Sequence, residues 1–192
     1  NLSQFLTAKP DLKISDKSQP SVLIFHTHTT ESYEMLDRGW YAQDYVTRSN
    51  SADRNMVRVG TEIKKQLEAA GYTVIHDTEI HDTKYTGAYD HSRKSVEKYL
   101  KQYPSIKIVL DLHRDSVTVT GNDKAKLVTK INGKKAAQVM LVMGSQSGSI
   151  KNHPNWQENL KLALRFQQIM EVMYPSLARP LSLTSKNYNE SL

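Results

Sequence analysis

Three short apolar runs, separated by polar segments, dominate the first half of the chain. Residues 21–26 and 106–112 are largely apolar, which is typical of strands covered on both faces of a parallel sheet. Residues 72–75 form a third, shorter run that includes β-branched side chains. The pattern therefore predicts three strands of a buried, mostly parallel central sheet.

Apolar residues at helical spacing lie between these predicted strands. From Asp53 they recur every three or four positions until Gly71 supplies a stop. Residues 96–103 repeat this spacing before Pro104, and a last helix is predicted over residues 162–173. The order strand, helix, strand, helix, strand favours right-handed crossovers. We therefore expect an α/β fold with helices on both faces of the sheet.

The second half of the chain carries a hairpin signal and one more apolar run. Asn132-Gly133 is typical of a tight hairpin turn, so a hairpin insertion is predicted there. Residues 138–143 are apolar enough to predict another central strand. Residues 1–20 are polar and without period, and we interpret them as a linker or tail. Residues 21–192 are long enough for one domain with its own core.

Two groups of histidine, carboxylate and arginine side chains follow predicted strands. They are His26, His28 and Glu31 after the first strand, and Asp111, His113 and Arg114 at the end of the third. Sites of open α/β sheets form at the carboxyl ends of strands, and neighbouring strands lie about 4.8 Å apart. His28 and His113 can therefore reach one metal ion, and Glu31 can add a carboxylate if the chain turns there. The sequence has no cysteine, so any metal must be bound by His, Asp or Glu.

The residues beside these histidines have second roles open to them. Asp111 can orient the imidazole of a ligand, and Arg114 can hold a substrate carboxylate or stabilise an oxyanion. An ordinary surface ion pair is an equally good interpretation of both. No catalytic role is expected for four histidines in loops or at element ends: His76, His81, His91 and His153.

The net charge of +6 favours an anionic partner. Lys and Arg are scattered rather than gathered in a stripe with aromatic residues, as on a solvated surface, so nucleic acid is not expected. A basic surface of this kind is also compatible with an acidic wall polymer. Phosphate-binding, dinucleotide-binding and nucleophile-elbow motifs are all missing. The residues alone leave open a metal-dependent phosphoesterase or esterase, and a metal-free wall-binding or scaffold module with a degenerate site.

Several motifs together resemble the sporulation stage II protein P family. They are His26-Thr-His28 through Ser32-Tyr33, Asp111-Leu-His-Arg-Asp115, Asn55 to Gly60, Tyr85-Thr-Gly87 with Ser92-Arg-Lys94, and Val139 to Gly144. The resemblance implies an amidase-like fold and hydrolysis of the amide between N-acetylmuramic acid and the stem peptide of peptidoglycan. The expected activity is that of an N-acetylmuramoyl-L-alanine amidase, with endopeptidase activity on peptide cross-links as an addition.

The resemblance also implies Zn²⁺ as the cofactor. His28 and His113 match the two histidine ligands of the related amidases, and His26 is a supporting residue. The carboxylate ligand of those amidases comes from the region before the first helix, which here offers only Asp53 and Glu62, so Glu31 is the predicted third ligand. The catalytic Glu of those amidases lies on a late strand, and we expect its counterpart beyond Leu192.

Partners and location follow from the same resemblance. It implies a protein outside the cytoplasm, tethered to the membrane by an N-terminal anchor that this chain does not include. The expected place is the intermembrane space between mother cell and forespore during engulfment. The expected partners are peptidoglycan, a membrane-anchored lytic transglycosylase and a scaffold protein of the engulfment machinery.

Overall fold

The structure is a computed structural model that describes residues 2–36, 39–40, 44–120, 124–146 and 153–184. The chain divides into two compact units, Lys13–Asp115 and the combination of Asn1–Leu12 with Ser116–Leu192. Both groups of strand-end histidines lie entirely in the first unit. The predicted hairpin lies in the second.

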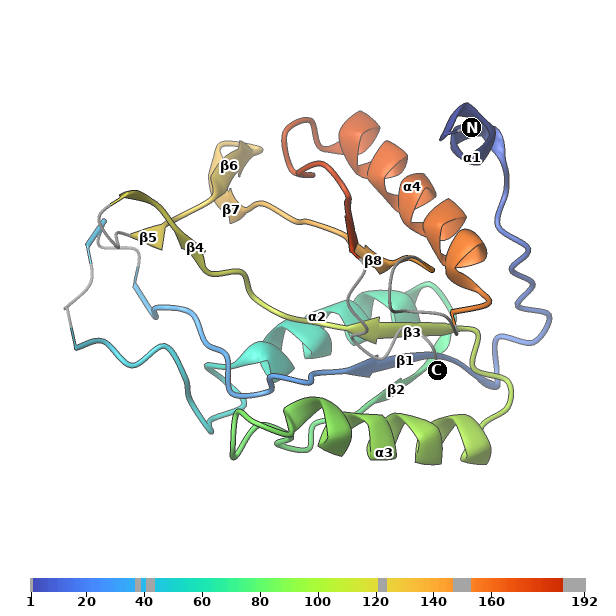
Figure 1. The fold of residues 1–192 in the computed structure, drawn as a ribbon, viewed down its shortest axis with the longest axis horizontal. Coiled ribbons are helices and arrows are strands. Elements are labelled where there is room, and N and C mark those ends of the chain that lie inside the picture. Colours follow the sequence, from blue (N-terminus) through green and yellow to red (C-terminus); the bar gives the residue numbers. More distant parts are fainter. Residues whose placement is uncertain (1, 37–38, 41–43, 121–123, 147–152, 185–192) are drawn as a thin grey trace. The chain divides into compact units, whose positions relative to one another are not determined.

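Three parallel strands form the sheet of the first unit, in the spatial order β2-β1-β3 (Figure 1). They are β1 (Pro20–Phe25), β2 (Thr73–His76) and β3 (Ile108–Asp111). Leu23 of the central strand is aligned with Ile75 on one side and Val109 on the other. Leu23 and Ile24 have no exposed surface, since β1 has a neighbour on each side. The three predicted parallel strands are confirmed.

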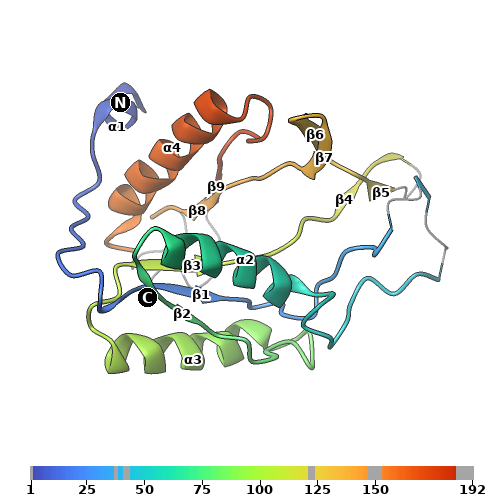
Figure 2. The same cartoon turned by 180° about the vertical axis from the view of Figure 1, so that it is seen from behind.

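Helix α2 (Met56–Ala69) covers one face of this sheet (Figure 2). It begins after Asn55, whose side-chain oxygen accepts a hydrogen bond from the Val57 backbone N–H. Its half-buried Ile63 and Leu67 pack against a cluster of buried side chains from β1 and β2. This apolar spacing is the one that predicts the helix, and the cap explains why it begins slightly later than Asp53.

Helix α3 (Ala88–Gln102) lies on the opposite face (Figures 1 and 2). Its buried residues Ala88, Ser92 and Val96 are spaced four apart and form one side of the helix. The helix begins eight residues before the predicted start at Val96, because its first two turns bury small side chains that carry little apolar signal. The predicted placement of helices on both faces is confirmed.

The third strand is less enclosed than its composition predicts. β3 lies at an edge of the sheet, and Val109 is 38% exposed. The expectation that residues 106–112 are buried on both faces is therefore wrong for Val109. The sequential order of the strands does not reveal that β1, the first in the chain, takes the central position.

The second unit consists of two helices and pairs of short strands. α4 (Trp156–Met173) ends before Pro175, as predicted, and α1 (Leu2–Thr7) contacts it, with the Phe5 ring 6.4 Å from that of Trp156. The strand pairs are β4 (Val117–Thr118) with β5 (Lys124–Ala125), β6 (Val128–Ile131) with β7 (Lys134–Ala137), and β8 (Val142–Gly144) with β9 (Ser182–Thr184). The helix α1 lies inside residues 1–20, and the domain division at residue 20 stays a prediction.

The predicted hairpin is confirmed, whereas the predicted fourth central strand is wrong. β6 and β7 are antiparallel, and Asn132 and Gly133 between them have φ angles of 51° and 77°, as a tight hairpin turn requires. Within residues 138–143 only the last two are in a strand, and β8 pairs with β9 in a sheet of its own. An apolar run indicates burial but does not select a partner strand. The fold is thus mixed α/β with small parallel and antiparallel sheets, and a larger amidase-like central sheet is not confirmed.

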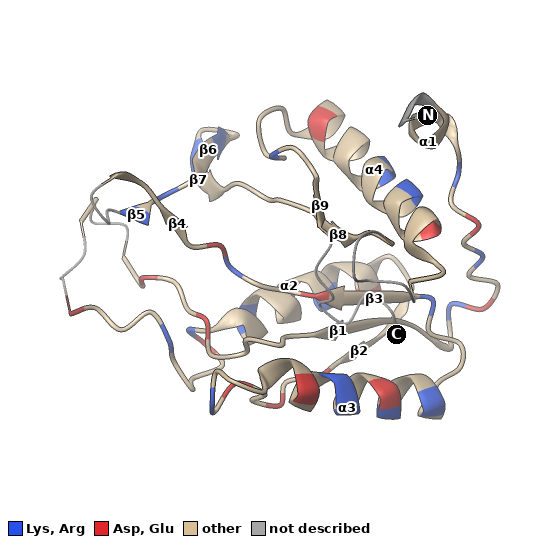
Figure 3. Cartoon of the chain, in the orientation of Figure 1, with Lys and Arg blue, Asp and Glu red and all other residues tan. Residues whose placement is uncertain are grey.

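Charged residues are spread over many elements (Figure 3). On α3 acidic and basic positions alternate along the helix, as on a solvated face, and Arg93 pairs with Glu97 one turn away. None of the helices in the described part of the chain has the length and apolar composition needed to cross a bilayer.

Candidate metal site at the strand ends

The residues that follow β1 and β3 lie side by side, because these two strands are neighbours. The ring centroids of His28 and His113 are 5.3 Å apart. Oε2 of Glu31 lies 3.6 Å from Nδ1 of His113. The structure therefore places the three predicted ligands next to one another.

His113 lies between two carboxylates. Its Nε2 is 3.0 Å from Oδ2 of Asp111, and its other ring nitrogen faces Glu31. Loss of hydration works against protonation of His113, but the hydrogen bonds to Asp111 and Glu31 outweigh it and raise its pKa to about 10. The two carboxylates thus stabilise a positive charge at this position, which an imidazolium or a bound metal dication can supply.

Asp111 is itself held by the segment that follows β1. Its Oδ1 accepts the Thr27 backbone N–H at 2.8 Å, and its Oδ2 accepts the Thr27 hydroxyl at 2.7 Å. The Thr27 hydroxyl also lies 2.8 Å from Oγ of Ser92 on α3. Asp111 therefore has a fixed orientation toward His113, the arrangement in which a carboxylate aligns a metal-binding imidazole.

His28 is buried and has an unused ring nitrogen. Burial lowers its pKa, so the ring is neutral near pH 7. Its Nδ1 has no hydrogen-bond partner within the described chain, and the nearest carboxylate oxygen, on Asp82, is 3.9 Å away. The ring stacks on Tyr85 with centroids 4.7 Å apart and 6° between the planes. A neutral imidazole with a free nitrogen is the form that binds a metal ion.

His26 uses both of its ring nitrogens within the protein. Nδ1 lies 3.2 Å from the carbonyl oxygen of Leu112, and Nε2 lies 2.9 Å from Nε2 of His76. The carbonyl only accepts, so Nδ1 of His26 carries the proton and His76 donates to Nε2. His26 therefore joins the ends of β2 and β3 to β1 and offers no nitrogen to a metal ion in this arrangement.

The His26–His76 pair is backed by Gly60 of α2. A Cβ at position 60 would lie 2.5 Å from Nε2 of His76 and 2.8 Å from Nε2 of His26. His26 is fully buried, so its ring has little room to move away from an added Cβ. We expect Gly60→Ala to lower the free energy of unfolding by about 1–3 kcal/mol, as overpacking does.

Urea unfolding followed by circular dichroism measures this effect. Glu62→Ala, on the exposed side of the same helix, is the matched control and should stay within about 0.5 kcal/mol of the parent. Equal stability of the Gly60→Ala and Glu62→Ala proteins would show that α2 does not press against the histidine pair.

Arg114 contributes to the site through its backbone. Its N–H donates to Oε2 of Glu31 at 3.1 Å and so fixes that carboxylate. Its guanidinium donates to the carbonyl oxygens of Thr47 and Asp115. The side chain thus ties the long loop after β1 to the segment after β3, while a role of Arg114 toward substrate stays a prediction.

Sequence reasoning missed a buried charged network beside His28. Asp82 accepts hydrogen bonds from the Thr30 backbone N–H at 3.1 Å and the Thr30 hydroxyl at 2.7 Å, and Nη1 of Arg48 donates to it as well. The Asp82 side chain has no exposed surface. These residues lie in irregular loops, where no periodicity marks a buried carboxylate, so the sequence offered only the closeness of Asp82 to His81 as a signal.

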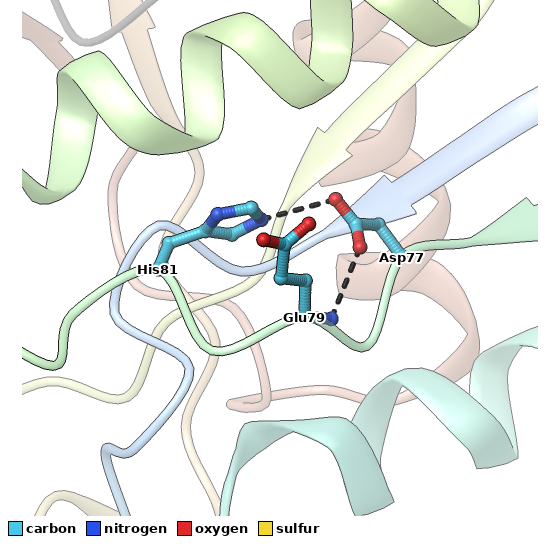
Figure 4. A group of neighbouring side chains, drawn as sticks. All are labelled: Asp77, Glu79 and His81. Carbon is cyan, nitrogen blue, oxygen red and sulfur yellow. Dashed lines mark hydrogen bonds and ion pairs between the residues drawn. The ribbon is translucent and has the colours of Figure 1, made fainter.

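A second cluster of ligand-type side chains lies just after β2. Asp77, Glu79 and His81 each offer an atom within 4.8 Å of the others, and the group can hold a metal ion (Figure 4). Nε2 of His81 is 3.0 Å from Oδ2 of Asp77, whose other oxygen accepts the Glu79 backbone N–H at 3.0 Å. His81, for which no catalytic role is predicted, is a member of this group.

The two clusters differ in how closely their ligand atoms approach. Among the described residues only the Asp77 group reaches the mutual spacing of 4.8 Å, so His28, Glu31 and His113 together are looser than that. Thr29 connects the clusters, because its hydroxyl lies 2.8 Å from the Glu79 carbonyl oxygen and accepts the His81 backbone N–H. The catalytic Glu expected beyond Leu192 stays a prediction.

An α/β unit with histidines and carboxylates gathered at the carboxyl ends of parallel strands defines a protein with a candidate metal site. The chain belongs to the stage II sporulation protein P family, because the family model described as Stage II sporulation protein P (SpoIIP) matches residues 4–192. The family resemblance predicted from the motifs is thereby confirmed, and the family name connects the chain with sporulation.

One curated relative supports the same assignment. The chain is 32% identical over 164 residues to stage II sporulation protein P of Bacillus subtilis (strain 168), and the aligned region covers 82% of this chain. The chain spans 37% of the length of that relative. No solved structure matches the chain.

Proposed function

We propose that the protein is a zinc-dependent peptidoglycan hydrolase that cleaves the amide between N-acetylmuramic acid and the stem peptide. The observation that carries the proposal is the buried Nδ1 of His28, which has no hydrogen-bond partner among the described residues, beside a His113 that two carboxylates hold. Membership of a sporulation family supports a substrate in the cell wall.

The donor set fits zinc. Two imidazoles and one carboxylate, His28, His113 and Glu31, are the ligands of many catalytic zinc sites. Zinc supplies a bound water of lowered pKa and polarises the amide carbonyl. In this chain Asp111 orients His113, the Arg114 backbone N–H orients Glu31, and Tyr85 stacks on His28.

The Asp77 group is the alternative position for the metal ion. Its buried members are already paired, because His81 and the Glu79 N–H occupy the two oxygens of Asp77. A metal ion there must displace the His81 hydrogen bond, just as a metal ion on His113 must replace its contact with Glu31. His28 differs, because its Nδ1 can bind a metal ion without losing a hydrogen bond to the described residues. We therefore favour His28, Glu31 and His113 as the ligands, which requires the His28 ring to move closer to the other two.

Metal content and product analysis test this proposal. We expect about one zinc per chain by elemental analysis and release of free stem peptides from purified peptidoglycan. Chelation of the zinc should stop the release, and added Zn²⁺ should restore it, because the chain's own carboxylates and histidines remain in place. Full activity after complete removal of zinc would overturn the proposal, and binding of peptidoglycan without any hydrolysis would favour a wall-binding module instead.

We further propose that the protein acts outside the cytoplasm, in the intermembrane space between mother cell and forespore, tethered through a segment outside this chain. The proposed partners are a membrane-anchored lytic transglycosylase and a scaffold protein. The peptide cross-links of the wall are a proposed additional substrate. The family's connection with sporulation and the net charge of +6, which suits an anionic wall polymer, support this setting. Fluorescent fusions followed through engulfment test the location, and a signal confined to the cytoplasm would contradict it.

A further inference from the structure

A polar pocket of about 300 Å³ lies beside the candidate metal site. Its wall includes Thr30, Arg48, Asn50 and Asp82, together with the apolar Ile80. Asp82 also borders His28, since Oδ2 of Asp82 is 3.9 Å from Nδ1 of that histidine. The pocket is therefore close enough to the site to receive a group attached to the same substrate.

Arg48 carries the charge that this pocket can offer to a ligand. Its side chain is 35% exposed, and among the described residues only Nη1 of its guanidinium is hydrogen-bonded, to Asp82 and to the Thr30 hydroxyl. The remaining N–H groups of the guanidinium are available. Their planar fork fits the two oxygens of a carboxylate.

The buried Asp82 does not cancel this recognition. Its oxygens accept the Thr30 N–H, the Thr30 hydroxyl and one arm of Arg48, so its charge is already stabilised by three donors. Asp82 holds Arg48 in one orientation and thereby lowers the entropy lost when a ligand binds. The exposed ring of Tyr85 lies under the guanidinium at 5.1 Å and stacks on His28 at 4.7 Å, so it connects the pocket with the site.

We propose that Arg48 and this pocket bind a free carboxylate on the peptide side of the amide that is cleaved. The inference rests on the proposed function and extends it to substrate selection. Stem peptides carry free carboxylates near the amide to muramic acid, and in some walls these are carboxamides. A carboxamide presents only one acceptor oxygen to the guanidinium and carries no charge, so the pocket distinguishes the two forms.

Two muramyl peptides that differ only in a carboxylate or carboxamide on the second stem residue test this inference. With the zinc-loaded protein we expect kcat/KM to be about tenfold or more in favour of the carboxylate, chiefly through KM, as for a charge-assisted hydrogen bond. Arg48→Gln should remove most of that preference. Arg93→Gln on α3 removes an equal charge away from the pocket and should leave the preference intact.

Arg48→Gln also leaves the buried Asp82 without its cation, so a second variant keeps the test independent of folding. Asn50→Asp places a carboxylate on the exposed part of the pocket wall without touching the Asp82 network. It should raise KM several-fold for the carboxylate substrate and leave KM for the carboxamide unchanged. Calorimetric titration of the two free product peptides, which needs no turnover, should show the same order of affinities.

The outcomes separate this inference from the proposed function. Hydrolysis of both substrates at equal kcat/KM, or a preference that neither Arg48→Gln nor Asn50→Asp alters, overturns the carboxylate pocket and leaves the hydrolase in place. A zinc-loaded full-length protein that cleaves neither substrate nor peptidoglycan overturns the proposed function itself.

Discussion

Replacing His113 by alanine is expected to lower kcat/KM for release of stem peptides by about a thousandfold or more, and to remove the bound zinc. His113 is the proposed ligand that the carboxylates of Asp111 and Glu31 hold in place, with oxygen to nitrogen distances of 3.0 and 3.6 Å. Without it the metal loses one of two imidazole ligands, and the electrostatic stabilisation that a metal gives to the transition state is worth several kcal/mol.

Zinc analysis and stem-peptide assays of three variants make this test selective. His81→Ala disrupts the Asp77 group and should leave zinc bound, because that group is not the proposed site. His91→Ala, on an exposed position of α3, controls for the loss of any histidine. If His81→Ala loses zinc while His113→Ala keeps it, the metal belongs to the Asp77 group and the ligand assignment is wrong.

Replacing Asp82 by alanine is expected to lower the free energy of unfolding by about 2–4 kcal/mol. The change leaves the buried N–H and hydroxyl of Thr30 without an acceptor, and each unsatisfied buried donor costs about 1–3 kcal/mol. The loss of Asp82 costs less at Arg48, since the Arg48 side chain is 35% exposed and water can hydrate its guanidinium.

Urea denaturation measures this loss, and the exposed Asp53 provides the control. Asp53→Ala removes the same charge from an exposed position and should change stability by no more than about 0.5 kcal/mol. A difference of less than about 0.5 kcal/mol between the Asp82→Ala and Asp53→Ala proteins would show that the network does not hold the loop after β1.

The parts of the fold with a strong local signal could be predicted from the sequence. β1 is a continuous apolar run, α2 has apolar side chains at helical spacing, and the Asn132-Gly133 turn follows from backbone preference alone. The first two turns of α3 could not be predicted, because Ala88 and Ser92 fill the close contact with the sheet. The pairing of residues 142–144 with 182–184 depends on contacts that no local pattern contains.

The candidate site likewise has a part that could be predicted from the sequence and a part that could not. The closeness of His28 and His113 could be predicted because both follow strands, and parallel strands end at one edge of a sheet. The Asp82 network, the Tyr85 stacking and the Asp77 group could not, because loops place these residues. Sequence reasoning also could not show that both nitrogens of His26 are occupied, which depends on Leu112 and His76.

The links made by Thr27 and His26 have a consequence for the order of folding. They join residues that are 84, 86 and 50 positions apart, so none of them can form before the chain has closed its long crossovers. Until β3 docks beside β1, Thr27 cannot orient Asp111, and His113 does not lie next to His28. A half-folded chain therefore has no assembled cluster of His28, Glu31 and His113, and the proposed metal site forms only when the three strands come together.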